Sequence, residues 1–332
     1  MTGARRASVP SRMPLPDGTA LGERLATGDL SAAPEVLNLV ENRTPAARPQ
    51  IAALLRRLSP AALGHEAAGH IVGVTGPPGA GKSSLLSELL REWRGGGRSV
   101  AVLAVDPSSK RSGGSLLGDR ARIAFDPADD QVFIRSTAAA GRLGGLAPAT
   151  REAAAILAAA FDVVVVETVG VGQSETDVAE VADTVAVVVQ PASGDTLQFL
   201  KSGIMEIPDV LVVTKSDLGE VALRARRDLS AALRSVGDRD TRVVAVSSLP
   251  PAQGMDELVA ALAAHREHLN LPARRLRARR ATALADFAAE HGERGLRSLG
   301  GARAAQRLLD AADPGADVPA LVDALAAEAA TA

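Results

Sequence analysis

Residues 71–93 read IVGVTGPPGAGKSSLLSELLREW, and they carry the clearest indication of the fold in this sequence. A short apolar strand leads into a glycine-rich turn, and apolar residues at helical spacing follow it. The turn, residues 76–83, fits the pattern G-x-x-x-x-G-K-[ST] between a strand and a helix. Because glycines let backbone amides curve around phosphate oxygens, the pattern predicts a phosphate-binding loop, or P-loop. A chance glycine turn is the alternative, which the strand–loop–helix order disfavours.

The side chains of this loop have expected roles. Lys82 is expected to reach the β- and γ-phosphates of a nucleoside triphosphate, and the Ser83 hydroxyl to hold Mg²⁺. The positive potential of the helix N-terminus adds to this attraction for phosphate. The predicted phosphate-binding residues are Gly76, Pro77, Pro78, Gly79, Ala80, Gly81, Lys82, Ser83 and Ser84.

Apolar strands alternate with amphipathic helices over residues 70–269. The expected strands are residues 71–75, 99–105, 132–135, 162–167, 184–190, 210–214 and 242–246, and clear helices are residues 82–94, 150–160 and 222–235. This alternation predicts an α/β fold of the P-loop NTPase class, with a mostly parallel sheet flanked by helices. The predicted division is a disordered N-terminus (1–18), an N-terminal helical extension (19–69), the P-loop domain (70–269) and a C-terminal helical region (270–332).

The stretch VVVVETVGVGQSE, residues 163–175, ends a buried strand with a carboxylate. In P-loop proteins a second strand carries an acid at its C-terminal end near Mg²⁺, and Glu167 fits that place. Gly170 follows three residues later, where its backbone N–H can meet the γ-phosphate. These residues predict a segment that responds to the third phosphate. A buried acid paired with an arginine for structural reasons is the alternative.

Two further acids flank a Gly/Ser-rich segment that follows another strand. Asp106 ends VAVLAVD, and Asp119 closes the segment DPSSKRSGGSLLGD. Both are candidates for contact with the metal or with its water. Alternatively, Asp106 starts a turn before Pro107 and Asp119 caps a helix. The predicted Mg²⁺ ligands are Ser83, Asp106, Asp119 and Glu167.

The strand DVLVVTKSDL indicates which base is bound. In GTPases the pattern [NT]-K-x-D places the aspartate, here Asp217, where its carboxylate accepts from guanine N1–H and the 2-amino group. The Lys215 stem packs over the base, and adenine offers no such pair of donors. One strand later, residues 247–249 resemble the loop that completes the guanine pocket. The predicted base-binding residues are Thr214, Lys215, Asp217, Ser247, Ser248 and Leu249; a helix-capping turn is the alternative.

Composition excludes several classes of function. With 39 acidic and 37 basic residues the chain is nearly neutral, which gives no case for nucleic acid or an anionic membrane as a partner. No cysteine is present, so disulfides and cysteine metal sites are excluded. No apolar run reaches the roughly 18 residues of a membrane span. The basic start, MTGARRASVPSRM, reads as a disordered N-terminus rather than a targeting segment, and a cytoplasmic location is expected.

An arginine-rich stretch lies near the start of the C-terminal helical region. Its members are Arg274, Arg275, Arg277, Arg279 and Arg280. Binding of nucleic acid or phospholipid is one interpretation. A solvated helix face, or pairing with Asp286 and Glu290 across a dimer, is the favoured one.

Several longer stretches add to these motifs. They are LVENR (39–43), GPPGAGKSS (76–84), VAVLAVDPSSKRSGGSLLGDRAR (100–122), LGGLAPATRE (143–152), VVVVETVGVGQSE (163–175), PASGDTLQFLKSGIMEIPD (191–209) and TKSD (214–217). Through them nearly the whole chain resembles the methylmalonyl-CoA mutase-associated GTPases, the MeaB/ArgK family of P-loop GTPases. The resemblance implies a GTPase that binds a cobalamin-dependent acyl-CoA mutase, gates adenosylcobalamin loading or exchange and protects the mutase. It also implies a homodimer built through the C-terminal helices.

The chain departs from the family in places. Thr214 stands where the family has asparagine, so guanine choice should hold with looser support from the loop. Residues 191–203 resemble the third switch, with Asp195 and Lys201 directed toward the mutase or the nucleotide. Thr196 and Phe199 are unusual there, and an exposed amphipathic helix is the alternative reading. The predicted catalytic residues are Lys82, Glu167, Asp195 and Lys201.

The residue after Gly170 bears on the rate of hydrolysis. Val171 stands there instead of a glutamine that could orient water, so slow hydrolysis in isolation is expected. Two rival functions belong to the same structural class. A nickel-inserting metallochaperone GTPase is disfavoured because the chain has no cysteine and no histidine-rich tract. An ATP-dependent kinase linked to amino-acid transport is disfavoured by TKSD.

Overall fold

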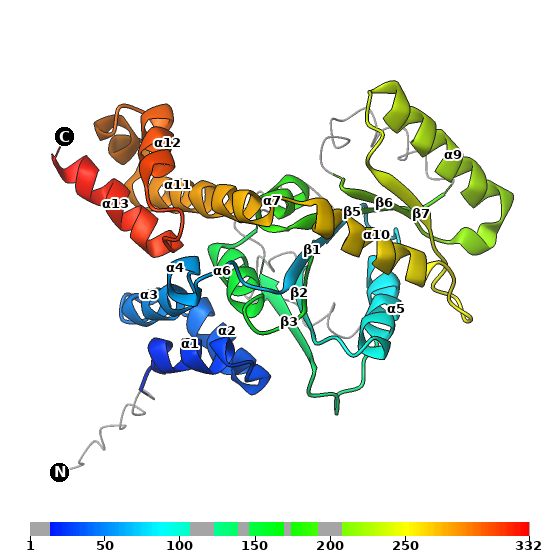
Figure 1. Cartoon of the computed structure of the whole chain (residues 1–332), viewed down its shortest axis with the longest axis horizontal. Coiled ribbons are helices and arrows are strands. Elements are labelled where there is room, and N and C mark those ends of the chain that lie inside the picture. Colours follow the sequence, from blue (N-terminus) through cyan, green and yellow to red (C-terminus); the bar gives the residue numbers. More distant parts are fainter. Residues whose placement is uncertain (1–13, 107–122, 139–145, 169–173, 192–207, 332) are drawn as a thin grey trace, which may run out of the picture.

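The computed structural model describes residues 14–106, 123–138, 146–168, 174–191 and 208–331, and Figure 1 shows their arrangement. Within these residues one seven-stranded sheet has the order β3-β2-β4-β1-β5-β6-β7, and all its neighbouring strands are parallel. The strands are β1 (His70–Thr75), β2 (Val100–Asp106), β3 (Val132–Ala138), β4 (Val163–Glu167), β5 (Thr184–Val189), β6 (Val210–Val213) and β7 (Arg242–Ala245). The α/β fold and the parallel sheet predicted from the sequence are confirmed.

Strand β3 differs most from its prediction, which ended at residue 135. It continues to Ala138 because β2 supplies a pairing partner for each of its residues, up to Asp106↔Ala138. Ser136 and Thr137 lack the apolar character that marks the other strands. Pairing with a neighbouring strand, rather than side-chain pattern, therefore sets the end of β3.

Helices cover both faces of the sheet. One face carries α5 (Lys82–Gly95) and α10 (Met255–His268), and the other carries α6 (Pro148–Leu157), α7 (Ser174–Val181) and α9 (Glu220–Ser235). Adjacent residues of β4 show why the strands are so rich in valine: Val164 and Val165 are fully buried in opposite apolar clusters. A 3₁₀ turn, η4 (Ser216–Leu218), follows β6.

Helical extensions precede and follow the sheet. The first comprises α1 (Gly18–Ala26), η1 (Leu30–Ala32), α2 (Ala33–Glu41), α3 (Arg48–Arg57) and α4 (Pro60–Leu63), and the second α11 (Leu271–Ser298), α12 (Ala302–Ala311) and α13 (Val318–Thr331). The first shares the apolar cluster of α6, whereas α11–α13 surround a cluster of their own. Figure 1 shows α12 and α13 at the far end of α11. The boundaries of the predicted units stay predictions. In the described part of the chain, none of the helices has the length and apolar character that a membrane crossing needs.

The arginine-rich start of α11 is not a fully solvated face, because Arg275 is buried and only Arg277 is exposed; pairing with Asp286 and Glu290 across a dimer stays a prediction. Arg275 is 7% exposed and forms a two-pronged ion pair with Asp183, which precedes β5, at 2.9 and 2.7 Å. Arg279 pairs with Glu66 through two bonds of 2.9 Å. Glu290 accepts from Arg48 of the same chain. These arginines fasten α11 to the chain's own core and to the linker before β1.

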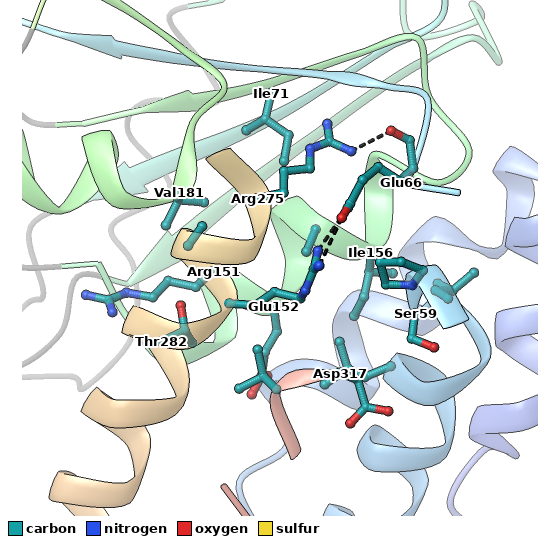
Figure 2. Close-up of a pocket in the computed structure, with 18 residues that line it drawn as sticks. Ser59, Glu66, Ile71, Arg151, Glu152, Ile156, Val181, Arg275, Thr282 and Asp317 are labelled. Carbon is teal, nitrogen blue, oxygen red and sulfur yellow. Dashed lines mark hydrogen bonds and ion pairs between the residues drawn. The ribbon is translucent and has the colours of Figure 1, made fainter. Parts of the chain in front are cut away.

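A cavity of about 100 Å³ lies where the two extensions meet the sheet domain. Figure 2 shows Arg275 and Glu152 among its lining residues, together with Ser59 and Asp317 from the two extensions. Ile71, near the start of β1, also lines it, whereas the P-loop follows the end of β1. The cavity therefore belongs to the joint between the units and not to the phosphate-binding loop.

Candidate nucleotide-binding site

The P-loop has the backbone that its glycines allow. Gly76 has a φ of +140°, and a Cβ at this position would lie 2.0 Å from the carbonyl oxygen of Val188 in β5. Gly81, the N-cap of α5, has a φ of +95°. Other residues rarely adopt either conformation. Since Gly81 has no side chain to accept from the first turn of α5, the amides of that turn can serve a phosphate.

The Lys82 ammonium points back into the loop. It donates to the carbonyl oxygens of Gly76 at 2.7 Å and of Pro77 at 3.2 Å, and the residue is 8% exposed. Its charge is thus held beside the amides that would surround the phosphates. This arrangement matches the role that the sequence predicts for Lys82.

Ser83 and Glu167 are brought together from α5 and β4. The Ser83 hydroxyl donates to Glu167 Oε1 at 3.3 Å. Glu167 is 5% exposed and lies between two strands, paired with Val74 of β1 and Ala104 of β2. Both side chains offer oxygen, the donor that Mg²⁺ prefers, so this pair fits the predicted metal site.

The other predicted metal ligands are placed less completely. Asp106 is the last residue of β2, so its backbone lies at the same edge of the sheet as Glu167. Its side chain and Asp119 lie outside the described residues, as do Gly170, Asp195, Lys201, Thr196 and Phe199. Their roles stay predictions.

Two threonines that the sequence analysis did not identify fix the chain after Glu167. The Thr168 hydroxyl donates to the Thr75 hydroxyl at 2.8 Å, and the Thr168 amide donates to the Val74 carbonyl at 3.0 Å. Both threonines are buried, at 1% and 0% exposure. They fasten the end of β4 to the residue that precedes the P-loop. The sequence signal that could have identified them is a threonine at the end of each strand: Thr75 directly before Gly76, and Thr168 directly after Glu167.

Thr214 joins the base motif to the P-loop. It is 3% exposed, and its hydroxyl lies 2.7 Å from the Ala80 carbonyl, to which it donates. Its amide donates to the Val189 carbonyl of β5 at 2.9 Å. The Thr214 hydroxyl therefore reaches the loop directly, and the looser support expected from threonine relative to asparagine stays a prediction.

Asp217 and the loop after β7 also meet. The Ser247 hydroxyl donates to Asp217 Oδ1 at 2.7 Å and accepts from the Leu249 amide at 3.2 Å. Ser247 is in turn held by two backbone bonds to Gln253, of 3.1 and 3.0 Å. Ser248 lies between these residues in the same loop. The Asp217 carboxylate is thus fixed in orientation, as recognition of a base edge requires.

A further residue absent from the sequence analysis lies beside this motif. Lys215 donates from Nζ to Gln190 Oε1 at 2.6 Å, and Gln190 directly follows β5. The sequence signal that could have identified Gln190 is its position at the end of a strand, the strand that precedes the one carrying the base motif. Five strand ends, those of β1, β4, β5, β6 and β7, therefore supply the site, as is usual for ligands of open parallel sheets.

Comparison with known proteins agrees with this geometry. The chain is 43% identical to a protein of Pyrococcus abyssi named as a GTPase, over 74% of this chain and 75% of that protein. It is 39% identical to the mitochondrial methylmalonic aciduria type A homolog of Caenorhabditis elegans, over 64% of this chain and 55% of that protein.

The crystal structure of a LAO/AO transport system kinase has a similar fold. Its TM-score is 0.63 at 26% identity, and the match covers 96% of this chain and 99% of that one. The family model for the methylmalonyl Co-A mutase-associated GTPase MeaB matches residues 33–294. A match of this extent means that the chain belongs to the MeaB family of methylmalonyl-CoA mutase-associated GTPases.

Proposed function

We propose that the protein hydrolyses GTP with Mg²⁺ and binds a cobalamin-dependent acyl-CoA mutase, specifically methylmalonyl-CoA mutase. Through this contact it gates the loading of adenosylcobalamin into the mutase and protects the mutase. Membership of the MeaB family and similarity to a methylmalonic aciduria type A homolog support this proposal. One observation carries the nucleotide part: Thr214 bonds the guanine motif directly to the P-loop at 2.7 Å. A single ligand with a base and phosphates would span both.

The described residues suggest how hydrolysis proceeds. The loop amides and Lys82 bind the phosphates and stabilise the charge that develops on the leaving group. Bound Mg²⁺ would neutralise phosphate charge, and Ser83 and Glu167 would hold it. The Glu167–Thr168 turn is anchored to β1, so the segment that follows begins from a fixed point. Completion of the site by a partner would then accelerate hydrolysis.

The choice of guanine follows from Asp217. Its carboxylate is oriented by Ser247, and guanine N1–H and the 2-amino group are the donors that match it. An adenine in the same place would leave the carboxylate without those donors. Similarity to the transport system kinase makes ATP-dependent kinase activity the second candidate. Nucleotide preference separates the two functions.

The mutase part of the proposal is tested by coupling. If the mutase prefers one nucleotide state, GTP must change mutase affinity and the mutase must change GTP turnover. Steady-state GTP hydrolysis is measured with and without methylmalonyl-CoA mutase of the same organism. The affinity for the mutase is measured in the presence of GDP and in the presence of a non-hydrolysable GTP analogue. We expect a severalfold rise in rate and unequal affinities.

Two substitutions refine this test. Lys201→Ala and Asp195→Ala should each reduce the coupling while leaving GDP affinity nearly intact. Equal mutase binding in both nucleotide states, with no change in rate, would remove the mutase role and leave a GTPase alone.

A further inference from the structure

Gln190 and Thr214 leave the sheet side by side. Strands β5 and β6 are parallel neighbours, and their last residues, Val189 and Val213, are paired in register. The next residue of each strand is therefore adjacent to the other across the edge of the sheet. Gln190 thus lies beside Thr214, the first residue of the base motif, whose side chain contacts the P-loop.

Lys215 is held at both ends. Among the described residues it is the one non-glycine residue with a positive φ, at +55°. Its neighbours fix this backbone, because Thr214 N donates to Val189 O and Ser216 N donates to Val246 O, each at 2.9 Å. At the other end Nζ donates to Gln190 Oε1 at 2.6 Å. Such a conformation costs free energy and persists where the surroundings fix it.

We propose that Gln190 is a positioning residue of the base pocket: its amide oxygen holds the Lys215 ammonium, so that the lysine stem forms a wall for the face of the base. This inference rests on the proposed function. An otherwise mobile lysine loses rotamer freedom on binding a ligand, and prior fixation avoids that loss. A neutral acceptor does so without placing a negative charge near an anionic nucleotide.

The proposed role predicts a distinctive pattern of affinities. The stem of Lys215 contacts a face that all purine bases share, whereas Asp217 reads the edge that distinguishes them. Gln190→Leu should therefore weaken GDP and IDP by the same factor, about 5-fold, from the loss of one charge-assisted hydrogen bond at an exposed site. Loss of the Asp217 carboxylate should instead change the ratio between the two nucleotides.

The experiment is calorimetric titration of the full-length protein with GDP and with IDP, in the presence of Mg²⁺. Gln190→Glu keeps an acceptor but adds a negative charge, so it should bind both nucleotides more tightly than Gln190→Leu and less tightly than wild type. Gln131→Leu is the matched control, because Gln131 bonds Asp130 in a loop before β3 and should leave both affinities unchanged. The unfolding temperature of each variant is measured alongside.

A double-mutant cycle assigns the effect to the lysine. Lys215→Met alone should weaken GDP binding, and Gln190→Leu should add nothing in that background. An equal additional loss in that background would overturn the proposal, as would an unchanged GDP affinity in Gln190→Leu. If wild-type protein binds ADP as well as GDP, the proposed GTPase function fails instead.

Discussion

The two edges of the sheet use buried polar residues in opposite ways. At the carboxyl edge, Lys82, Glu167 and Thr214 come from loops and strand ends that surround one place, where phosphates and a base would lie. At the amino edge, Asp183 is paired with Arg275 and also accepts from the Ile71 amide at 2.9 Å. The first arrangement surrounds the proposed nucleotide site, whereas the second joins α11 to the sheet.

A chain of hydrogen bonds extends the amino-edge network. The Thr184 hydroxyl lies 2.8 Å from His70 Nε2 and 2.8 Å from His265 Nδ1, and His265 Nε2 lies 3.2 Å from Asp209. Burial lowers the pKa of His70 to about 3, so its ring is neutral near pH 7. Buried polar residues alone therefore do not identify a functional site, because at both edges they are hydrogen-bonded to protein groups.

The largest expected effect is at the amino edge. Arg275→Met should lower the free energy of unfolding by about 3–5 kcal/mol, because it leaves the Asp183 carboxylate buried without its cation. Urea denaturation measures the loss, and Arg277→Met, at an exposed position of the same helix, is the matched control. Asp183→Asn combined with Arg275→Met should recover part of the loss. A change below about 1 kcal/mol would show that α11 is not fastened by this pair.

The joint between the units should also respond to pH. Burial raises the pKa of Glu152 from 4.5 to about 7, against the opposing effect of Arg43. The folded state therefore retains a proton that the unfolded state has lost, and this contribution to stability is lost as pH rises through about 7. The free energy of unfolding of Glu152→Gln, relative to that of wild type, should rise by about 2.5 kcal/mol between pH 5 and pH 8. Urea denaturation at both pH values tests this, and a constant difference would contradict it.

At the carboxyl edge, catalysis should suffer more than stability. Lys82→Ala should lower GTP hydrolysis by ~10² or more, since it removes the charge beside the phosphates. The free energy of unfolding should change by less than about 1 kcal/mol. Steady-state hydrolysis and urea denaturation of the same preparations provide the two values. The opposite pattern, with stability lost and hydrolysis kept, would erase the distinction between the edges.

Thr214→Val should give the smallest effect, and it should lower both the stability of the protein and its affinity for GDP. It removes a buried hydroxyl donor while conserving shape, so we expect about 1 kcal/mol of lost stability and a comparable loss of GDP affinity. Calorimetric titration and thermal unfolding measure the two. Unchanged GDP affinity would mean that the bond to Ala80 does not position the base motif relative to the loop.

The same comparison explains how much the sequence could predict. The carboxyl edge was accessible because its signals are local: glycines at fixed spacing, Lys82 and Ser83 at a helix start, and Glu167 closing a run of valines. The order of short motifs along the chain predicted that residues 247–249 and Asp217 lie in the same pocket, but not the bond between Ser247 and Asp217. Short apolar runs likewise indicated all seven strands.

The amino edge was not accessible in this way. Arg275 and Asp183 are 92 residues apart, and no local pattern distinguishes a buried arginine from the exposed Arg277 two positions later. Gln190 illustrates the same limit at the site itself, because its role depends on β5 and β6 being neighbours in the sheet. Local spacing predicts loops that bind ligands, whereas long-range polar pairing requires the fold.

The central claim is that the carboxyl edge binds a guanine nucleotide, and calorimetric titration with GDP and ADP at fixed Mg²⁺ tests it most directly. The Asp217 carboxylate, oriented by Ser247, should make GDP bind ~10²-fold more tightly than ADP or better. Asp217→Asn should reverse the preference toward xanthosine diphosphate, whose 2-oxo group suits an amide donor. Equal affinity of the wild-type protein for GDP and ADP, or unchanged GDP affinity in Asp217→Asn, would contradict the claim.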